Sequence, residues 1–420
     1  MSKFREILKN RNFLFLWLGQ IISQLGDRLD QMALIGLVYL RTQGGSGSTF
    51  EMAKILSFTI LPVFLIGPVA GVYVDRWDRR RTMFICDFLR SILILSIPTL
   101  LFYSRSLIPI YVVIFIVFSI GRFFVPAKMA IIPDLVDEKD LLICNSLVNT
   151  TGMIAAILGF GLSGLIVEWL GAKSGFFLDS LSFFISGLLI FLIAIGQKKN
   201  VKFTDVGKEI VGVLRKSVLQ EIKDGILYFI KSHQIRFTAG IIFILWSALG
   251  AVYVVLIVFV QSALGSVTKD LGLLAMCVGI GLFGGSLLYG RFGQRLPHFR
   301  TIFYSLVLAG FNLIAFALGL KYNPNFFLAA LLSILLGIIV APIMIAANTV
   351  VHRVSEDKMR GKIFSSLEVV MHLGFLLFMF MSSALAEWFS QEKILVAVGI
   401  FLIIIGVCSI FAQRKILWLE

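Results

Sequence analysis

Charged residues are scarce in this sequence: Asp, Glu, Lys and Arg make up 15% of its 420 residues, while 58% are hydrophobic. The mean hydropathy of +0.95 lies far outside the range of soluble domains. The four cysteines have no paired spacing, so we expect neither a disulfide framework nor a thiolate metal site. The sequence contains no Walker loop, metal-ligand cluster or glycine-rich nucleotide motif. These absences exclude a soluble domain and favour a membrane protein that works without a cofactor or an ATP site.

Long apolar runs dominate the chain instead. A helix needs about 20 apolar residues to cross the hydrocarbon of a bilayer. Twelve segments meet this requirement, at residues 12–40, 50–74, 82–102, 108–127, 146–170, 175–195, 238–264, 271–290, 301–320, 326–347, 363–389 and 394–412. We therefore predict an all-α membrane protein with twelve transmembrane helices. The first run is too long for a cleaved signal and lacks a small-residue cleavage site, so we expect it to remain as a helix.

The positive charges lie mainly on one side of these spans. Of the 38 Lys and Arg residues, 28 fall on the side of the N-terminus, 7 on the opposite side and three, Arg28, Arg90 and Arg122, within spans. Because short cytoplasmic loops hold the positive excess, we expect both termini in the cytoplasm of a bacterial-type inner membrane. The net charge of +14 then reflects basic loops that face anionic lipids, and no nucleic-acid partner is expected.

A single long polar interruption divides the chain into two halves. We predict a six-helix bundle at 1–196, a basic linker at 197–237 and a second six-helix bundle at 238–420. Within the linker, VLQEIKDGILYFIKSHQIR has an apolar helical face and should lie along the cytoplasmic membrane surface. GVYVDRWDRRR from Gly71 aligns with SLLYGRFGQRL from Ser286, and Pro126, which we expect to close the fourth span, aligns with Pro342. Such internal repeats are typical of secondary transporters.

The first of these repeated loops resembles the loop signature of the major facilitator superfamily. It departs from the family at Asp78, where glycine is usual, and its second copy has Gly290 in place of the acid. The segments LGDRLDQMAL, RFFVPAKMAIIPDLV and DKMRGKIFSS resemble the exporter branch that includes macrolide efflux permeases and siderophore exporters. The resemblance covers the whole chain and implies two six-helix halves that rock about a central site.

The resemblance also implies a cytoplasmic gating network. In the family, the acid at the position of Asp75 pairs with an arginine of the fourth span, here Arg122, and faces the start of span eleven near Gly361. Asp87 and Arg90 lie three positions apart, and they either join this network or only shield each other as a local pair. The predicted network comprises Gly71, Asp75, Arg76, Arg79, Asp87, Arg90 and Arg122. The alternative for its arginine run is a topology anchor.

Three charged residues lie within the first span. Asp27 falls near its middle, next to Arg28, and Asp30 lies one turn farther. A charge at the bilayer centre costs about 2.5–3.5 kcal/mol, which makes each a functional hypothesis. We interpret Asp27 as a binding site for a proton or a cationic substrate, tuned by Arg28 and Asp30. Arg28 points about 100° away from Asp27 and should pair more easily with an acid on another span. The alternative is a fixed charge cluster that holds the span against its neighbours.

Glu368 and His372 form a second candidate pair in span eleven. Their i, i+4 spacing places them on one helix face, roughly halfway through the membrane. Because histidine titrates near neutral pH, the pair could exchange protons in a cavity. The alternative is a Glu–His hydrogen bond that neutralises itself and packs.

The fifth span contains the stretch ILGFGLSGLI. Phe160 stands where antiporters of the superfamily carry proline, and Ser163 where they carry glycine. Residues 161–164 also match the Gly-x-Ser-Gly pattern of rhomboid intramembrane proteases, for which His372 would be the available base. A pattern of four mostly small residues is common by chance in membrane helices, so this reading ranks last.

We therefore predict a secondary transporter, not an enzyme. It should export an amphipathic or apolar small molecule with protons as the coupling ion, embedded in membrane lipid and acting as a monomer. A lysophospholipid-type flippase and the intramembrane serine protease are the alternatives.

Overall fold

The computed structural model describes residues 7–45, 47–74, 77–103, 106–194, 233–293, 296–354 and 360–412. Twelve long α-helices account for most of them, and a 3-10 turn, Glu138–Asp140, precedes α6. The helices are α2 (Arg11–Thr42), α3 (Ser48–Val74), α4 (Arg79–Tyr103), α5 (Ile108–Leu135), α6 (Leu141–Leu170), α7 (Ala172–Phe191), α10 (His233–Leu264), α11 (Lys269–Phe292), α12 (His298–Tyr322), α13 (Phe326–Val354), α14 (Arg360–Leu385) and α15 (Gln391–Ala412).

Each predicted span corresponds to one of these helices, so the prediction of an all-α membrane fold is confirmed for the described part of the chain. Helices form because every backbone N–H and C=O must find a partner inside the hydrocarbon. Eleven of the twelve are apolar enough to cross a membrane by length and composition. The helix that does not meet this criterion is α2, which carries five charged residues.

The fourth span was predicted to end near Pro126, and this boundary is wrong. Helix α5 continues to Leu135 with Pro126 and Pro133 inside it. A proline removes one backbone donor, but neighbouring groups in a membrane bundle satisfy the freed carbonyl, so the helix continues. Arg122 therefore lies near the middle of the helix, and Lys128, which the charge count placed in a loop, lies within it.

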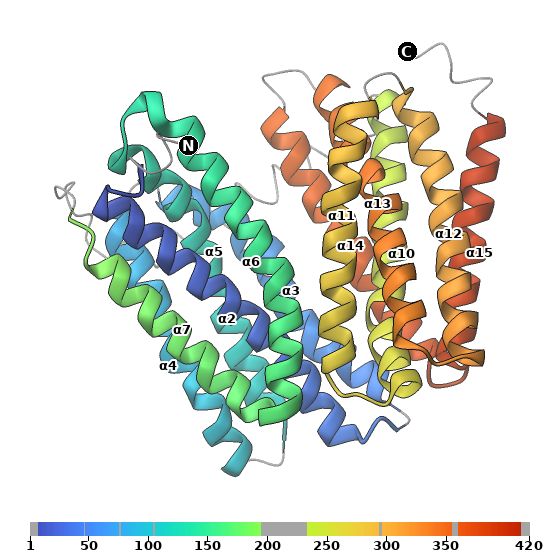
Figure 1. Ribbon diagram of the computed structural model, residues 1–420, viewed down its shortest axis with the longest axis horizontal. Helices are drawn as coiled ribbons and strands as arrows, with labels where there is room; N and C mark the ends of the chain where they lie inside the picture. Colours follow the sequence, from blue (N-terminus) through green and yellow to red (C-terminus); the bar gives the residue numbers. More distant parts are fainter. Residues whose placement is uncertain are drawn as a thin grey trace. The chain divides into compact units, whose positions relative to one another are not determined.

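The described helices fall into two compact units. The first holds α2 as far as Leu37 and the chain from Ile55 through α7, and the second holds residues 38–54 and α10 to α15 (Figure 1). The predicted linker and its amphipathic helix fall largely in residues 195–232, outside the described residues.

In the first unit, α4 packs against both α5 and α7. Helix α7 places its polar residues inward, since Asp179, Ser182 and Ser186 are buried. Its outward face exposes Leu181 and Leu188 by about half of their surface. This distribution is what a lipid-facing helix with a polar interior requires.

Helix α2 lies between α6 and α7 in the same unit. Toward α6, the indole N–H of Trp17 donates to Thr151 Oγ1 at 2.9 Å. Toward α7, a Cβ on Gly26 would lie 1.9 Å from Ser182 Oγ and 2.4 Å from Asp179 Oδ1. Glycine at position 26 therefore allows a contact between α2 and α7 that any side chain would prevent. In Figure 1, α2 runs alongside α7.

Candidate functional site

A polar stripe runs along one face of α2. It consists of Gln20, Ser23, Gln24, Asp27, Arg28 and Gln31. These positions follow the i, i+3, i+4, i+7, i+8, i+11 spacing of a single helical face. The stripe lines a cavity of about 260 Å³, which α4 and α5 complete. Asp27 and Arg28 of the first span therefore face a cavity lined by residues of this unit rather than lipid.

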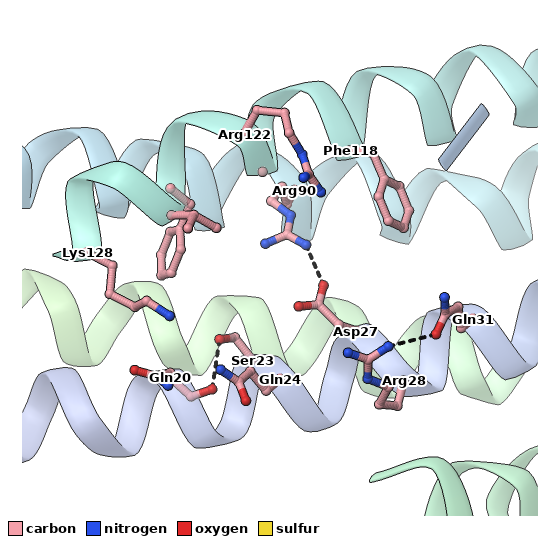
Figure 2. Close-up of a pocket in the computed structure, with 13 residues that line it drawn as sticks. Gln20, Ser23, Gln24, Asp27, Arg28, Gln31, Arg90, Phe118, Arg122 and Lys128 are labelled. Atoms are coloured by element: carbon pink, nitrogen blue, oxygen red, sulfur yellow. Dashed lines mark hydrogen bonds and ion pairs between the residues drawn. The ribbon is translucent and has the colours of Figure 1, made fainter. Parts of the chain in front are cut away.

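Three cationic side chains approach this stripe from the other two helices. Arg90 comes from α4, and Arg122 and Lys128 come from α5 (Figure 2). Figure 2 shows Arg90 and Lys128 pointing toward the polar residues of α2, with Arg122 beside Arg90. Their arrangement concentrates positive charge on the side of the cavity opposite α2.

The central contact of the site is an ion pair between Asp27 and Arg90. Arg90 Nη2 lies 2.5 Å from Asp27 Oδ1. The Arg90 side chain is only 8% exposed, whereas that of Asp27 is 37% exposed. The guanidinium also lies over the ring of Phe183 on α7, with Cζ 3.7 Å from the ring centroid. The pair thus has one side embedded in protein and one side open to the cavity.

Arg90 also links Asp27 to acids that are fully buried. Its Nη1 lies 3.9 Å from Asp87 Oδ1, and Ser186 Oγ donates to Asp87 Oδ2 at 2.6 Å. The charge of Arg90 further acts on Asp179 of α7. Asp87 therefore belongs to the same cluster as Asp27, so the two groups that the sequence treated separately are joined by Arg90.

Asp30 and Asp179 complete the cluster behind the cavity. Asp30 is 2% exposed, Asp87 and Asp179 are 0% exposed, and one oxygen of each has no hydrogen-bond partner among the described residues. An ionised carboxylate in such a place costs several kcal/mol unless it is paired. Asp27 and these three buried aspartates thus gather around one buried arginine, and Arg90 is the counter-charge on which the cluster depends.

Arg28 was expected to pair with an acid on another span, and the structure shows different partners. Its Nη1 donates to Gln31 Oε1 at 2.9 Å, and its Cζ lies 4.6 Å from the ring centroid of Phe160 on α6. A Cβ on Gly159 would lie 2.9 Å from Arg28 Cγ. Phe160, which replaces the proline of the antiporter pattern, thus supports an arginine of the cavity.

The predicted gating network is only partly visible. Asp75 and Arg76 lie outside the described residues, and Gly71 is described only as part of α3. Arg79 Nη1 donates to Asp134 Oδ2 and to the carbonyl of Ala130, both at 2.7 Å. Arg79 therefore binds near the end of α5, and the pairing of Asp75 with Arg122 stays a prediction.

Asp78, the departure from the family signature, caps a helix. Its Oδ1 accepts the backbone N–H of Arg81 at 2.8 Å in the first turn of α4. This is the bond that an aspartate N-cap makes to the third residue of a helix. The arginine run that follows also contacts its own unit, because Arg80 Nη2 donates to the carbonyl of Phe191 at 2.5 Å.

In the second unit, His372 bonds to Glu368 through the backbone. His372 Nδ1 donates to the carbonyl oxygen of Glu368 at 2.7 Å, and its ring lies 5.3 Å from that of Trp246. The Glu368 side chain is exposed.

The second unit also contains a separate apolar cavity of about 420 Å³, which lies between α10, α14 and α15 and has Lys393 as its charged lining residue.

Comparison with known proteins identifies the family. The model of the Major Facilitator Superfamily matches residues 16–319 and also residues 237–416. The chain belongs to the major facilitator superfamily. Macrolide efflux protein A of Streptococcus pyogenes is 24% identical over 387 residues, which cover 89% of this chain and 89% of that protein. Uncharacterized MFS-type transporter YfiS of Bacillus subtilis is 24% identical over 425 residues, with coverage of 98% and 95%.

Solved structures of other transporters share the fold. A POT family transporter in complex with 5-aminolevulinic acid gives a TM-score of 0.72 at 13% identity, over 97% of this chain and 96% of that one. A bacterial homologue of iron transporter ferroportin in an inward-facing state gives 0.69 at 14% identity, over 95% and 98%. The resemblance drawn from the loop signature is thus confirmed, and membership of the superfamily indicates a multi-pass membrane transporter.

Several residues of this candidate site were not named from the sequence. Gln20, Gln24 and Gln31 would have emerged from the 3–4 spacing that they share with Asp27. Lys128 was missed because the fourth span was ended too early. Asp179 was visible as a lone acid in an apolar run, but its position behind α2 depends on Gly26, which no sequence pattern connects to it.

Proposed function

We propose that this superfamily member is a proton-coupled exporter of an amphipathic or apolar small molecule, working by alternating access. The observation that carries the proposal is the Asp27–Arg90 ion pair, which opens on the cavity and continues into a buried acid cluster. The naming of Macrolide efflux protein A as an efflux protein supports the direction of transport.

The ion pair offers a physical route for coupling. A proton that binds Asp27 from the cavity removes the charge that holds Arg90 at 2.5 Å. Arg90 then keeps its contacts with Asp87 of α4 and with the ring of Phe183 of α7, but no longer attracts α2 through Asp27. A change of protonation at the cavity surface therefore alters the electrostatic attraction between α2, α4 and α7, which is the differential interaction that a conformational switch needs.

The remaining predictions fit this function. Asp30 would tune the protonation of Asp27, and Glu368 with His372 would supply further proton-binding groups in the second unit. Asp75 and Arg122, with the arginines around them, would close the cytoplasmic side. We place the protein in a bacterial inner membrane as a monomer with both termini in the cytoplasm, in accord with the distribution of Lys and Arg.

Asp27→Asn tests the coupling directly, because it keeps the size of the side chain and removes its charge. In proteoliposomes, flux of the exported compound should no longer respond to an imposed pH gradient, while exchange of that compound across the membrane continues. Asp137→Asn is the matched control, since Asp137 pairs with Lys139 at 3.1 Å and is 73% exposed. If Asp27→Asn still concentrates the compound at the parent's rate and pH dependence, the coupling role is wrong.

A further inference from the structure

We propose that the cavity of the first unit recognises an anionic group on the transported molecule, such as a carboxylate, sulfonate or phosphate. The proposal rests on the transport function above, because it names the chemistry of the ligand for that cavity. It departs from the part of the sequence-based interpretation in which Asp27 binds a cationic substrate.

The charges that line the cavity favour an anion. Four cationic side chains line it, and Asp27 is the only acid among the lining residues. Asp27 is already committed to Arg90 by the 2.5 Å ion pair. Arg28 makes its polar contact with the neutral amide of Gln31 rather than with an acid. Asp27, Asp30, Asp87 and Asp179 offset the charge of Arg90. The attraction for an anion therefore comes from the other cations of the lining, such as Arg28 and Lys128, which would repel a cationic ligand.

The hydrogen-bonding groups point to the same ligand. Arg28 and Lys128 are among the residues that line the cavity, and Arg28 makes its printed polar contact with the amide of Gln31. Guanidinium donors match the planar or tetrahedral oxygens of carboxylate and phosphate. The amide of Gln24 and the ammonium of Lys128 add donors around the same space.

The size of the cavity limits what it can hold. A volume of about 260 Å³ lies just below the range of about 300–1,000 Å³ that encloses a drug-sized molecule. The cavity therefore suits one charged group and a short apolar segment, with the rest of an amphipathic ligand outside it. Phe118, Phe124 and Val125 of α5 supply the apolar part of its lining.

The test compares two probes that share a naphthalene ring and carry head groups of opposite charge. Full-length protein in nanodiscs of neutral lipid is titrated with naphthalene-2-sulfonate and with 2-naphthyltrimethylammonium. The parent should bind the sulfonate in preference to the ammonium. Lys128→Gln and Arg28→Gln should each weaken sulfonate binding by about 10-fold or more, the value of one charge-assisted hydrogen bond. Lys139→Gln, which removes a charge outside the cavity, should leave it unchanged.

Asp27→Asn separates this proposal from its opposite. Removing the one acid should raise sulfonate affinity by about 5- to 50-fold, because a nearby like charge is lost. If Asp27 instead binds a cation, Asp27→Asn should abolish binding of the ammonium and leave the affinity for the sulfonate unchanged. That result would overturn the proposal. Preferential binding of the ammonium by the parent would overturn it as well.

A third probe, lysophosphatidic acid, distinguishes the two sources of an anionic group. Competition between this lipid and the sulfonate would assign the cavity to a lipid headgroup, whereas sulfonate binding that the lipid does not displace would assign it to a soluble amphipath. These equilibrium measurements need no ion gradient. Anion binding can therefore be confirmed even if proton coupling fails, and coupling can hold even if anion binding fails.

Discussion

Arg90→Gln should destabilise the first unit by leaving acids without their counter-charge. Removing one partner of a buried ion pair costs about 3–5 kcal/mol. Asp27 is 37% exposed, so water screens its share of this loss, and Asp87 at 0% exposure carries most of it. Loss of the guanidinium over Phe183 adds about 0.5–2 kcal/mol. We therefore expect a total near 3–5 kcal/mol, which corresponds to a fall in melting temperature on the order of 10 °C.

The chain contains its own reporters for this experiment. Cys86 and Cys144 are buried in the first unit, so once the more accessible Cys277 and Cys408 are replaced by alanine, a thiol-reactive fluorophore records unfolding of this unit. Adding Asp87→Asn to Arg90→Gln should restore about half of the lost stability, because the orphaned charge is then removed. Arg79→Gln breaks an ion pair that water can reach and should cost about 1 kcal/mol. Equal melting temperatures for Arg90→Gln with and without Asp87→Asn would refute the reasoning.

Two further predictions concern a helix contact and the second unit. Gly26→Ala should lower the melting temperature through overpacking of about 1–3 kcal/mol, with partial rescue by Ser182→Gly, whereas Gly67→Ala meets no atom within 4 Å and should be tolerated. Because His372 donates to a backbone carbonyl, Glu368→Gln leaves that bond intact. Flux losses from Glu368→Gln and His372→Gln should therefore add in the double variant, and a double variant no worse than either single one would contradict this.

The helices were predictable because apolar runs of spanning length have one stable form in hydrocarbon. The ends of the helices were less predictable, because a proline ends a membrane helix only where no neighbouring group can satisfy the freed carbonyl. Helix α5 continues past Pro126 for this reason. The polar stripe of α2 was also within reach of the sequence, since its spacing alone assigns Gln20 and Gln31 to the face of Asp27.

The partner of Asp27 was not predictable in the same way. Arg90 lies 63 positions away on another helix, and the sequence offers it a nearer acid, Asp87, at a helical spacing. Which of the two acids lies closer to Arg90 depends on how α2 and α4 pack. In the structure the guanidinium of Arg90 lies 2.5 Å from Asp27 and 3.9 Å from Asp87. The buried hydroxyl of Ser186 on α7 donates a hydrogen bond to Asp87 and thereby supplies part of the stabilisation that a closer arginine would give this carboxylate.

The charges of the first span thus follow from the two faces of α2. One face, with Gly26 and Asp30, packs against α7, and the other, with Asp27, lines the cavity, so neither set of charges has to contact lipid. A helix enclosed in this way can carry residues that a lipid-facing helix cannot. Because protein surrounds its charged residues, α2 can serve as a span although it is less apolar than the eleven helices that meet the length and composition expected of a membrane span. Because α2 carries Asp27 and Arg28 on the face that lines the cavity, substitutions of single charges on this helix should affect transport most.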